Sequence, residues 1–339
     1  MTEEWAGDGL VTVVVPARNE EAHIEPCLRS VLQQDYASLQ VVVVDGDSDD
    51  ATADVVRAIA RDDPRVELLT NPRAIIPVSL NLGLAAARGR WLVRIDAHST
   101  VPRGYVRHVV SRLRSGEYAG VGGRKDGVGR TPAGRAIAAA MGSRFGVGNS
   151  IYHYATEATE VEHVPFGAYR VDVARSLGGW DEELRVNQDF EFDHRLRGAG
   201  HRLLFDPQLT IDWQCRQQIP DLYRQYRRYG RGKVLVMKKH PSSVRPRHLV
   251  APGLVAGMGL AGLIGVRRPA VATKMVAPYF LGTVIAAGIT ARRVTGIRER
   301  SWLVPAFVAM HLGWGVGFWQ GLLEELRPPT QQRRRSEQA

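Results

Sequence analysis

The chain has 339 residues, of which 44% are hydrophobic and 24% are charged, and its formal net charge is +10. This composition excludes a largely disordered protein, and the length is sufficient for two or more structural units. The two cysteines, Cys27 and Cys215, stand far apart, which excludes a disulfide framework and suits a reducing compartment.

The N-terminal two thirds of the chain alternate β-branched runs with helical stretches. We predict strands at 11–15, 41–44, 66–69 and 91–95, and helices at 20–34, 52–61 and 77–87. This alternation predicts an α/β fold with a mostly parallel central sheet. Ligands of such sheets bind beyond the carboxyl ends of the strands, where Arg18, Asp45 and Asp96 fall.

A basic block and three apolar segments follow. Residues 214–248 contain ten Lys or Arg and one acid, and the uncharged runs cover about 249–266, 275–291 and 302–323. Because a helix needs about 20 apolar residues to cross a bilayer, we predict a membrane region at 249–326 with two to three helices. A buried hairpin of a soluble domain is the weaker alternative. The basic segment 215–248 points to membrane lipids as partners rather than nucleic acid, because no nucleic-acid motif accompanies it.

The topology of this region stays open. Basic residues occur in both connecting loops and in the tail, so the positive-inside rule does not choose an orientation. We predict that the basic tail at 327–339 is disordered. Three crossings would place this tail outside the cytoplasm. One of the three segments could instead be interfacial or re-entrant. The first ten residues have no apolar core, so we expect the domain at 1–248 to stay in the cytoplasm.

Three acidic motifs carry the candidate chemistry. Asp45 is placed to bind a ribose or a base, although acids in this run also cap helices. Asp96 and His98, two positions apart, are able to hold one divalent ion, although an ordinary strand-to-loop turn has the same pattern. Asp189 lies beside aromatic residues and is a candidate general base. The alternatives for Asp189 are a solvated helix start, which suits Glu191 and Asp193 better than Asp189, and an ion pair with Arg195.

Taken in order, these motifs resemble the family 2 glycosyltransferases, which have a GT-A fold. They are most similar to the membrane-associated members that build bacterial exopolysaccharides, such as the succinoglycan glucosyltransferase type. The resemblance covers residues 11 to about 240 and then the membrane tail. The matching segments are 13–21, 43–52, 71–83, 94–98, 166–170 with 178–182, 188–189 and 225–229.

The resemblance implies a set of site residues. Those that bind the nucleotide sugar are Pro16, Ala17, Arg18, Asn19, Glu20, Asp45, Asp47, Arg73 and Asp96. Those on the acceptor or phosphate side are Gly167, Arg170, Trp180, Asp181, Gln225, Arg228 and Tyr229. Asp189 is the implied base, and Asp96 with His98 holds the metal, Mn²⁺ or Mg²⁺. The chain departs from the family pattern at His98, which replaces an aspartate, and at Gln188, which replaces a glutamate.

The implied function is inverting transfer of a sugar from a nucleotide-diphosphate-sugar to a lipid-linked, polyprenyl-type glycan acceptor at the cytoplasmic membrane. Such a reaction belongs to cell-surface polysaccharide biosynthesis. Two alternatives stay open. The segment 225–229 is similar to a motif of processive polysaccharide synthases, and the departures at Gln188 and His98 allow a non-catalytic membrane protein that binds a nucleotide sugar.

Overall fold

The computed structural model describes residues 9–326, and these form two compact units. The first unit comprises 9–126 and 151–214, and the second comprises 127–150 and 215–326. The predicted boundary after residue 248 remains a prediction, and the predicted disordered tail at 327–339 lies outside the described residues.

The first unit is an α/β domain. Its strands are β1 (Val11–Ala17), β2 (Leu39–Asp45), β3 (Val66–Thr70), β4 (Trp91–Arg94), β5 (Ser99–Thr100), β6 (Gly120–Val128, which runs on into the second unit), β7 (Thr159–Glu160), β8 (Ala168–Arg170) and β9 (Leu203–Gln214). Its helices are α1 (Ile24–Leu32), α2 (Thr52–Asp62), α3 (Ile76–Ala86), α4 (Tyr105–Leu113), α7 (Val171–Ser176) and α8 (Gln188–Gly198), with a 3₁₀ turn at Ile151–His153. The four strands and three helices predicted within 11–95 are all present.

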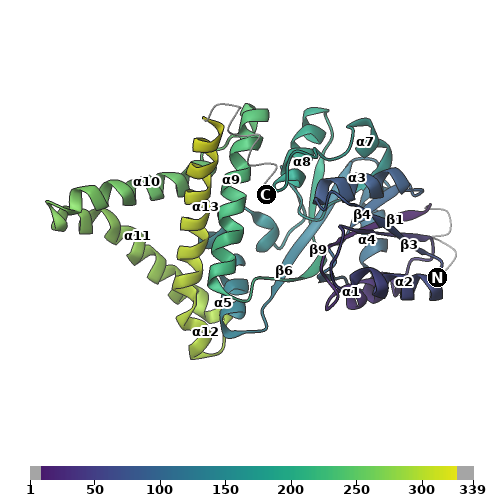
Figure 1. The fold of residues 1–339 in the computed structure, drawn as a ribbon, viewed down its shortest axis with the longest axis horizontal. Helices are drawn as coiled ribbons and strands as arrows, with labels where there is room; N and C mark the ends of the chain where they lie inside the picture. The colour runs from purple at the N-terminus through teal and green to yellow at the C-terminus, as the bar shows by residue number, and fades with distance from the viewer. Residues whose placement is uncertain (1–8, 327–339) are drawn as a thin grey trace. The chain divides into compact units, whose positions relative to one another are not determined.

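The strands form a mixed sheet in the order β3-β2-β1-β4-β8-β6-β9-β5, with β7 paired to β9. The expected parallel sheet occupies the half made by β3, β2, β1 and β4. The pairs β4–β8, β6–β8, β5–β9 and β7–β9 are antiparallel and extend this sheet. In Figure 1, α1 and α2 lie on one side of the parallel half and α3 lies on the other. This arrangement agrees with the right-handed connections expected of βαβ units.

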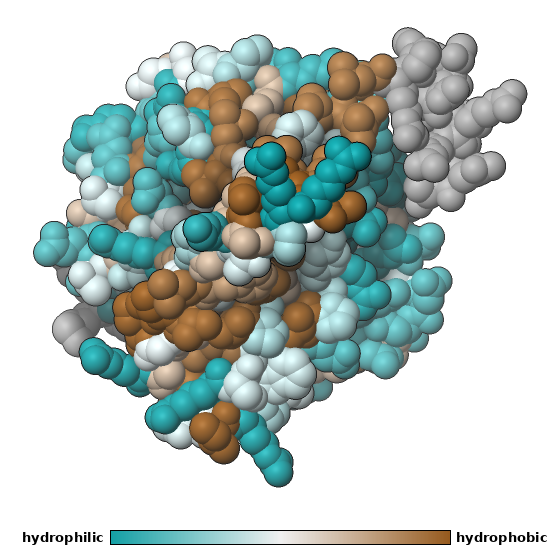
Figure 2. Space-filling view, turned by 90° about the vertical axis from the view of Figure 1, so that its left-hand side faces the viewer, coloured by the Kyte–Doolittle hydropathy of each residue, from teal (hydrophilic) through white to brown (hydrophobic). Residues whose placement is uncertain are grey.

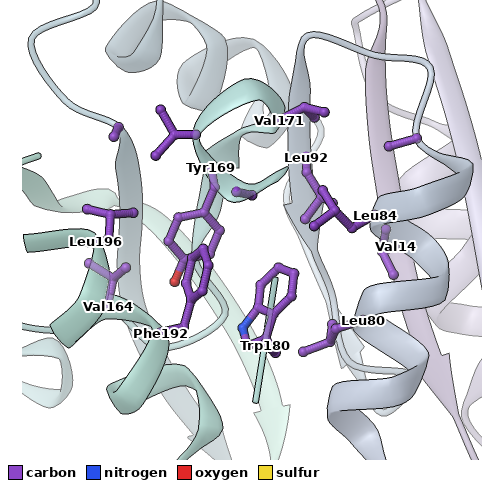
Figure 3. Packing of buried hydrophobic residues seen from close by; sticks show 14 of the residues in the cluster. Val14, Leu80, Leu84, Leu92, Val164, Tyr169, Val171, Trp180, Phe192 and Leu196 are labelled. Atoms are coloured by element: carbon purple, nitrogen blue, oxygen red, sulfur yellow. The ribbon is translucent and has the colours of Figure 1, made fainter. Parts of the chain in front are cut away.

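The core of the first unit follows from the alternation of side chains along the strands. Side chains alternate between the two faces of a strand. Val14 of β1 and Leu92 of β4 belong to the same buried cluster and so point to the same face of the sheet. Figure 3 shows these two side chains with Leu80 of α3 and the aromatic rings of Trp180 and Phe192. The α3 helix approaches β1 so closely that a Cβ at Gly83 would lie 2.4 Å from a methyl carbon of Val14. Glycine at position 83 therefore allows the helix to pack on the sheet.

The second unit is helical in its described part. Its helices are α5 (Pro132–Met141), α6 (Arg144–Val147), α9 (Ile219–Lys239), α10 (Arg247–Gly265), α11 (Pro269–Thr290), α12 (Ile297–Ser301) and α13 (Leu303–Glu325). Short 3₁₀ turns lie at Pro241–Ser243 and Ala291–Arg293. The helical segments that contain α10, α11 and α13 are long and apolar enough to cross a membrane. Figure 2 faces the α10–α11 hairpin and shows broad apolar areas.

Candidate active site

Two loops interlock at the carboxyl edge of the parallel strands. Asn19, after β1, accepts a hydrogen bond from the Asp49 backbone through Oδ1 (2.9 Å), and its own N–H donates to the Ser48 hydroxyl (2.9 Å). The Glu20 N–H donates to the Thr52 hydroxyl (2.8 Å). The buried carboxylate of Asp45 accepts hydrogen bonds from the N–H and hydroxyl of Ser48. Asp45 thus shapes the loop that follows β2.

Backbone conformation at this edge is unusual. Asn19, Asp47 and Ala74, from the loops after β1, β2 and β3, have φ of 54°, 59° and 53°. Left-handed backbone of this kind is uncommon outside glycine, and it clusters where the surrounding structure fixes a functional loop. Arg18 and Asp47 are exposed at the same edge, beside the partly buried Pro16 and the buried Ala17.

A buried arginine links the two carboxylates that the sequence motifs singled out. Arg94, the last residue of β4, is 3% exposed. Its Nε donates to Asp96 Oδ1 at 2.8 Å, and its Nη1 donates to Asp189 Oδ1. Asp189 lies in the first turn of α8, 95 positions further along the chain. Arg94 therefore holds the candidate metal ligand and the candidate base at one place.

The charges of this cluster support one another. Burial by itself raises the pKa of the Asp96 carboxyl, but the charge and the hydrogen bond of Arg94, together with the charge of Lys125, hold that pKa below its ordinary value. Burial by itself lowers the pKa of the Arg94 guanidinium. The charges of Asp189 and Asp96 raise it by more, so the pKa of Arg94 lies above its ordinary value. Asp96 is therefore ionised and Arg94 is charged at neutral pH.

His98 and Glu20 form the next pair outward. The Nδ1 atom of His98 lies 2.9 Å from Glu20 Oε1, and both side chains are partly exposed. Among the described residues, no three His, Cys, Asp or Glu side chains form a ready metal cage. The set still fits a divalent ion, because Mg²⁺ in nucleotide sites is commonly held by one or two carboxylates plus the phosphates of the substrate. Asp96 and His98 are the residues that would hold it.

The start of α8 shows why Asp189 differs from its acidic neighbours. The expected alternative pairing with Arg195 is wrong, because Arg195 Nε donates to Glu191 Oε1 at 2.6 Å. Glu191 and Asp193 are also not solvated, being 1% and 0% exposed. Asp193 Oδ1 accepts from the Tyr169 hydroxyl at 2.8 Å. These two acids are structural, which leaves Asp189 as the acid of this helix that faces the cluster.

Four residues of the cluster, Arg94, Lys125, Phe166 and Trp213, were not predicted as site residues from the sequence. The ammonium of Lys125 on β6 lies 3.7 Å from the ring centroid of Trp213 on β9 and 4.4 Å from that of Phe166. The guanidinium carbon of Arg94 lies 5.4 Å from the centroid of the Phe166 ring. Phe166 has a φ of 49°. An arginine inside the apolar strand at 91–95 is a signal that could have identified Arg94, and Phe166 begins a segment that resembles the family. Lys125 and Trp213 have no comparable signal.

The residues expected on the acceptor side separate in the structure. Gly167 is buried beside Phe166, just before β8. Trp180 is 2% exposed and stacks on Phe192 with ring centroids 4.6 Å apart, so its predicted role as a ligand contact is corrected to a core role. Asp181 accepts the Glu183 N–H at 2.9 Å in the turn before α8.

Arg170 is not at the carboxyl edge with Asp96. It pairs with Trp91, the first residue of β4, because β8 runs antiparallel to β4. Its guanidinium binds Asp172. The antiparallel direction of β8 therefore puts Arg170 at the opposite edge of the sheet from Asp96, and its role on the acceptor side stays a prediction.

The remaining predicted residues lie in two places. Arg73, after β3, forms an ion pair with Glu182, whose carboxylate also accepts from Asn81 (3.0 Å). Gln225, Arg228 and Tyr229 lie on α9 in the second unit. The buried Gln225 donates to the Tyr229 hydroxyl at 2.9 Å, and Arg228 is exposed.

Comparisons with known proteins identify the family of this chain. Residues 12–178 match the family model described as glycosyl transferase family 2. The chain is 30% identical over 318 residues to the succinoglycan biosynthesis protein ExoA of Rhizobium meliloti, covering 92% of this chain and 94% of that protein. It is also 26% identical over 239 residues to the dolichyl N-acetyl-α-D-glucosaminyl phosphate 3-β-D-2,3-diacetamido-2,3-dideoxy-β-D-glucuronosyltransferase of Methanococcus voltae, covering 68% of this chain and 74% of that one.

A solved structure shares the fold. The mannosyltransferase PcManGT of Pyrobaculum calidifontis, determined with GDP-Man and Mn²⁺, superimposes with a TM-score of 0.60 and 21% identity. The superposition covers 94% of this chain and 88% of that one. With a GT-A fold, a carboxylate cluster at the carboxyl edge of its sheet and relatives of this kind, the chain belongs to glycosyl transferase family 2 and is a glycosyltransferase.

Proposed function

We propose that the protein transfers a sugar, with inversion, from a nucleotide-diphosphate-sugar to a lipid-linked glycan acceptor at the cytoplasmic face of a membrane, in exopolysaccharide biosynthesis. The observation that carries the proposal is the contact of Arg94 with both Asp96 and Asp189. It puts a candidate base and a candidate diphosphate site next to each other. The succinoglycan relative supports the product class, and the relative named for a dolichyl N-acetyl-α-D-glucosaminyl phosphate supports the lipid-linked acceptor.

The donor would lie along the carboxyl edge of the parallel strands. Asp45 and the loop after β1, with Asn19 and Glu20, surround the place for the base and ribose. Lys125, held over Trp213 and Phe166, adds positive charge beside Asp96 for the diphosphate. The Mn²⁺ and GDP-Man of the fold neighbour support a divalent ion and a nucleotide sugar as ligands. An ion held by Asp96 and His98 would neutralise the charge that develops on the departing diphosphate.

The transfer itself needs one proton acceptor. Asp189 Oδ1 accepts a hydrogen bond from Arg94, which orients the carboxylate and leaves Oδ2 for the hydroxyl of the acceptor. Asp189 takes the proton of that hydroxyl while its oxygen forms a bond to the anomeric carbon. The bond from this carbon to the diphosphate oxygen breaks, and the nucleoside diphosphate leaves with the electron pair. Attack from the face opposite the leaving group inverts the anomeric centre.

The test uses the full-length chain in lipid vesicles with UDP-, GDP- and dTDP-sugars, each with Mn²⁺ or Mg²⁺. We expect one donor to release its nucleoside diphosphate when a polyprenyl-linked acceptor is present. Asp189→Asn should lower this rate by roughly 10²–10⁴-fold while donor affinity is kept, because general-base catalysis contributes about that much. Asp54→Asn, at an exposed acid of α2, is the matched control.

Four outcomes would contradict parts of the proposal. Full activity of Asp189→Asn would remove the assigned base. Equal use of simple water-soluble acceptors would remove the lipid-linked acceptor, and long products from single encounters would indicate a processive synthase. Absence of donor binding by the folded protein would remove the enzymatic proposal as a whole.

A further inference from the structure

The three apolar helices of the second unit do not have the same surroundings. In α13, 50% of the most apolar window is buried within the protein, against 17% in α10 and 17% in α11. Length and hydropathy do not distinguish the three helices, because each is long and apolar enough to cross a membrane. The protein contacts of α13 therefore help to decide which of the three helices face lipid.

One face of α13 lies against the backbone of α9. Glycines recur at every fourth position, and a Cβ at Gly313, Gly317 or Gly321 would lie 2.7, 1.9 or 2.7 Å from the carbonyl oxygens of Tyr223, Arg227 and Arg231 in turn. Since contacts advance by four residues on both helices, the two run parallel and in close contact. Small residues at such spacing permit close approach of helix backbones.

The partner helix α9 is strongly basic. It contains seven Lys or Arg among its residues Ile219–Lys239. Two ion pairs join it to the end of α13, Arg231 with Glu324 and Lys238 with Glu325, each at 2.6 Å. Ionised side chains are costly within a bilayer and are rare in spanning helices. A helix as charged as α9 does not enter the hydrocarbon, and α13 is bound along it.

The first half of α13 is held in the same unit. The ring of His311 contacts the carbonyl oxygen of Phe145 on α6 through Nε2 at 2.8 Å. Just before α13, Glu299 accepts from Arg135 of α5 (Nε, 3.0 Å), and Arg293 donates to the carbonyl of Gly142. The first half of α13 is thus held by contacts with α6 and α5, and its end is held by the ion pairs with α9.

The α10–α11 hairpin has the opposite character. Its apolar side chains point outward, with Leu263 75% and Val266 83% exposed, and Figure 2 shows apolar areas on the face that it presents. At 1.5 Å per residue, helices of 19 and 22 residues are about 28 and 33 Å long, which matches a hydrocarbon core of about 30 Å. The turn between them carries Arg267 and Arg268.

We propose that α10 and α11 are the two membrane crossings of this chain and that α13 does not cross. The turn at Arg267 then lies on the far side of the bilayer. The basic helix α9, the α11–α13 connection and the end of α13 lie together on the near side. This topology does not depend on the proposed enzymatic function.

The test labels single cysteines in the full-length chain in intact bacterial cells with a membrane-impermeant maleimide, before and after permeabilisation. The variants are Arg267→Cys, Arg298→Cys and Leu326→Cys, and the unsubstituted chain, whose two cysteines are buried, gives the background. If the near side is cytoplasmic, Arg267→Cys is labelled in intact cells, and the other two react only after permeabilisation.

Other labelling patterns overturn the proposal. Labelling of Leu326→Cys in intact cells would establish a third crossing by α13. Labelling of Arg267→Cys only after permeabilisation would show that the hairpin does not cross. Alkaline phosphatase inserted after Arg267, which is active only outside the cytoplasm, repeats the test without depending on thiol reactivity.

A matched pair of glycine variants tests the packing on which the topology rests. Gly317→Ala places a methyl group against the α9 backbone, whereas a Cβ at Gly257 of α10 meets nothing within 4 Å. Gly317→Ala should lower the melting temperature of the detergent-solubilised protein, and Gly257→Ala should leave it unchanged. Equal melting temperatures for the two variants would show that the α9–α13 contact does not hold α13 on the near side of the membrane.

Discussion

At the carboxyl edge of the sheet, a guanidinium is buried between two carboxylates, and Arg94, Asp96 and Asp189 share their charges within the protein. In the α10–α11 hairpin the relation is reversed, because apolar side chains such as Leu263 are exposed and have few protein neighbours. The first region makes its own polar environment inside an apolar core. The second region has the surface of a segment whose solvent is lipid.

This difference indicates that substitutions have different energetic consequences in the two regions. Burying a charge is costly unless it is paired, so each member of the Arg94 cluster depends on the others. An exposed apolar side chain in the hairpin has no such dependence on a protein partner. Substitutions should therefore have large, coupled effects at the sheet edge and small, independent effects in the hairpin.

The largest expected effect is at Arg94. Arg94→Met leaves Asp96 and Asp189 without the cation between them, and breaking a buried ion pair costs about 3–5 kcal/mol of unfolding free energy. We expect sugar transfer to fall by roughly 10²-fold or more, because misplacement of a catalytic group by about 1 Å has that effect. Denaturant unfolding and initial rates measure the two quantities.

Two further variants sharpen this test. Arg94→Lys keeps the charge but loses the forked geometry, so stability should recover more than the rate of transfer does. Arg90→Met, at an exposed arginine beside β4, is the control and should change neither quantity appreciably. An Arg94→Met protein with the stability and rate of the unsubstituted chain would contradict the role assigned to this residue.

The second prediction compares one substitution in both regions. Leu92→Ala, within the sheet core, should lower the free energy of unfolding by about 2–5 kcal/mol, because a buried leucine leaves a cavity when it is truncated. Leu263→Ala, in the hairpin, should stay within about 0.5 kcal/mol of the unsubstituted chain. Both are measured by denaturant unfolding of the detergent-solubilised protein. Similar losses at the two sites would mean that protein packing, not lipid, covers the hairpin.

The smallest expected effect concerns pH. Burial raises the pKa of Asp206 on β9, but hydrogen bonds from His108 (2.9 Å), Gln208 (2.9 Å) and Arg112 (2.6 Å) hold it below its ordinary value. A carboxyl whose pKa is lowered in the folded state contributes stability that is complete above the unfolded value, about 3.9. That contribution is lost as the pH falls through the lower pKa of the folded state.

Asp206→Asn should therefore cost about 1–3 kcal/mol at pH 7 and flatten the loss of stability below about pH 4. Asp212→Asn on the same strand is the matched control. Burial and the nearby Asp126 raise the pKa of Asp212, so removing its charge should not destabilise the protein at neutral pH. Melting temperatures measured from pH 3 to pH 7 decide between these outcomes, and identical pH profiles for the two variants would contradict the assignment.

Much of the parallel half of the fold was predictable from local patterns. The valine runs of β1 and β2 are buried on both faces, and such strands appear in a sequence as continuous apolar stretches. The positions of Asp45 and Asp96 at strand ends followed from the same patterns. The antiparallel strands were not predicted, and their direction is what moved Arg170 to the opposite edge of the sheet.

The candidate site was predictable as a set of motifs but not as a set of contacts. The acidic motifs identified Asp96 and Asp189, yet the pairing of Asp189 with Arg94 rather than Arg195 depends on how α8 packs on the sheet. Trp180 illustrates the opposite error. It lies within a segment that resembles the acceptor side of the family, but its indole ring is part of the core.

The sequence by itself determined where strands, helices and apolar segments lie, because these depend on periodicity and hydropathy over a few neighbouring residues. The tertiary structure decided which distant residues meet. Arg94 joins Asp96 to an aspartate 95 positions away, and α13 lies against α9 although its hydropathy resembles that of α10 and α11. Such contacts depend on close packing between segments far apart in the chain, which no local pattern encodes.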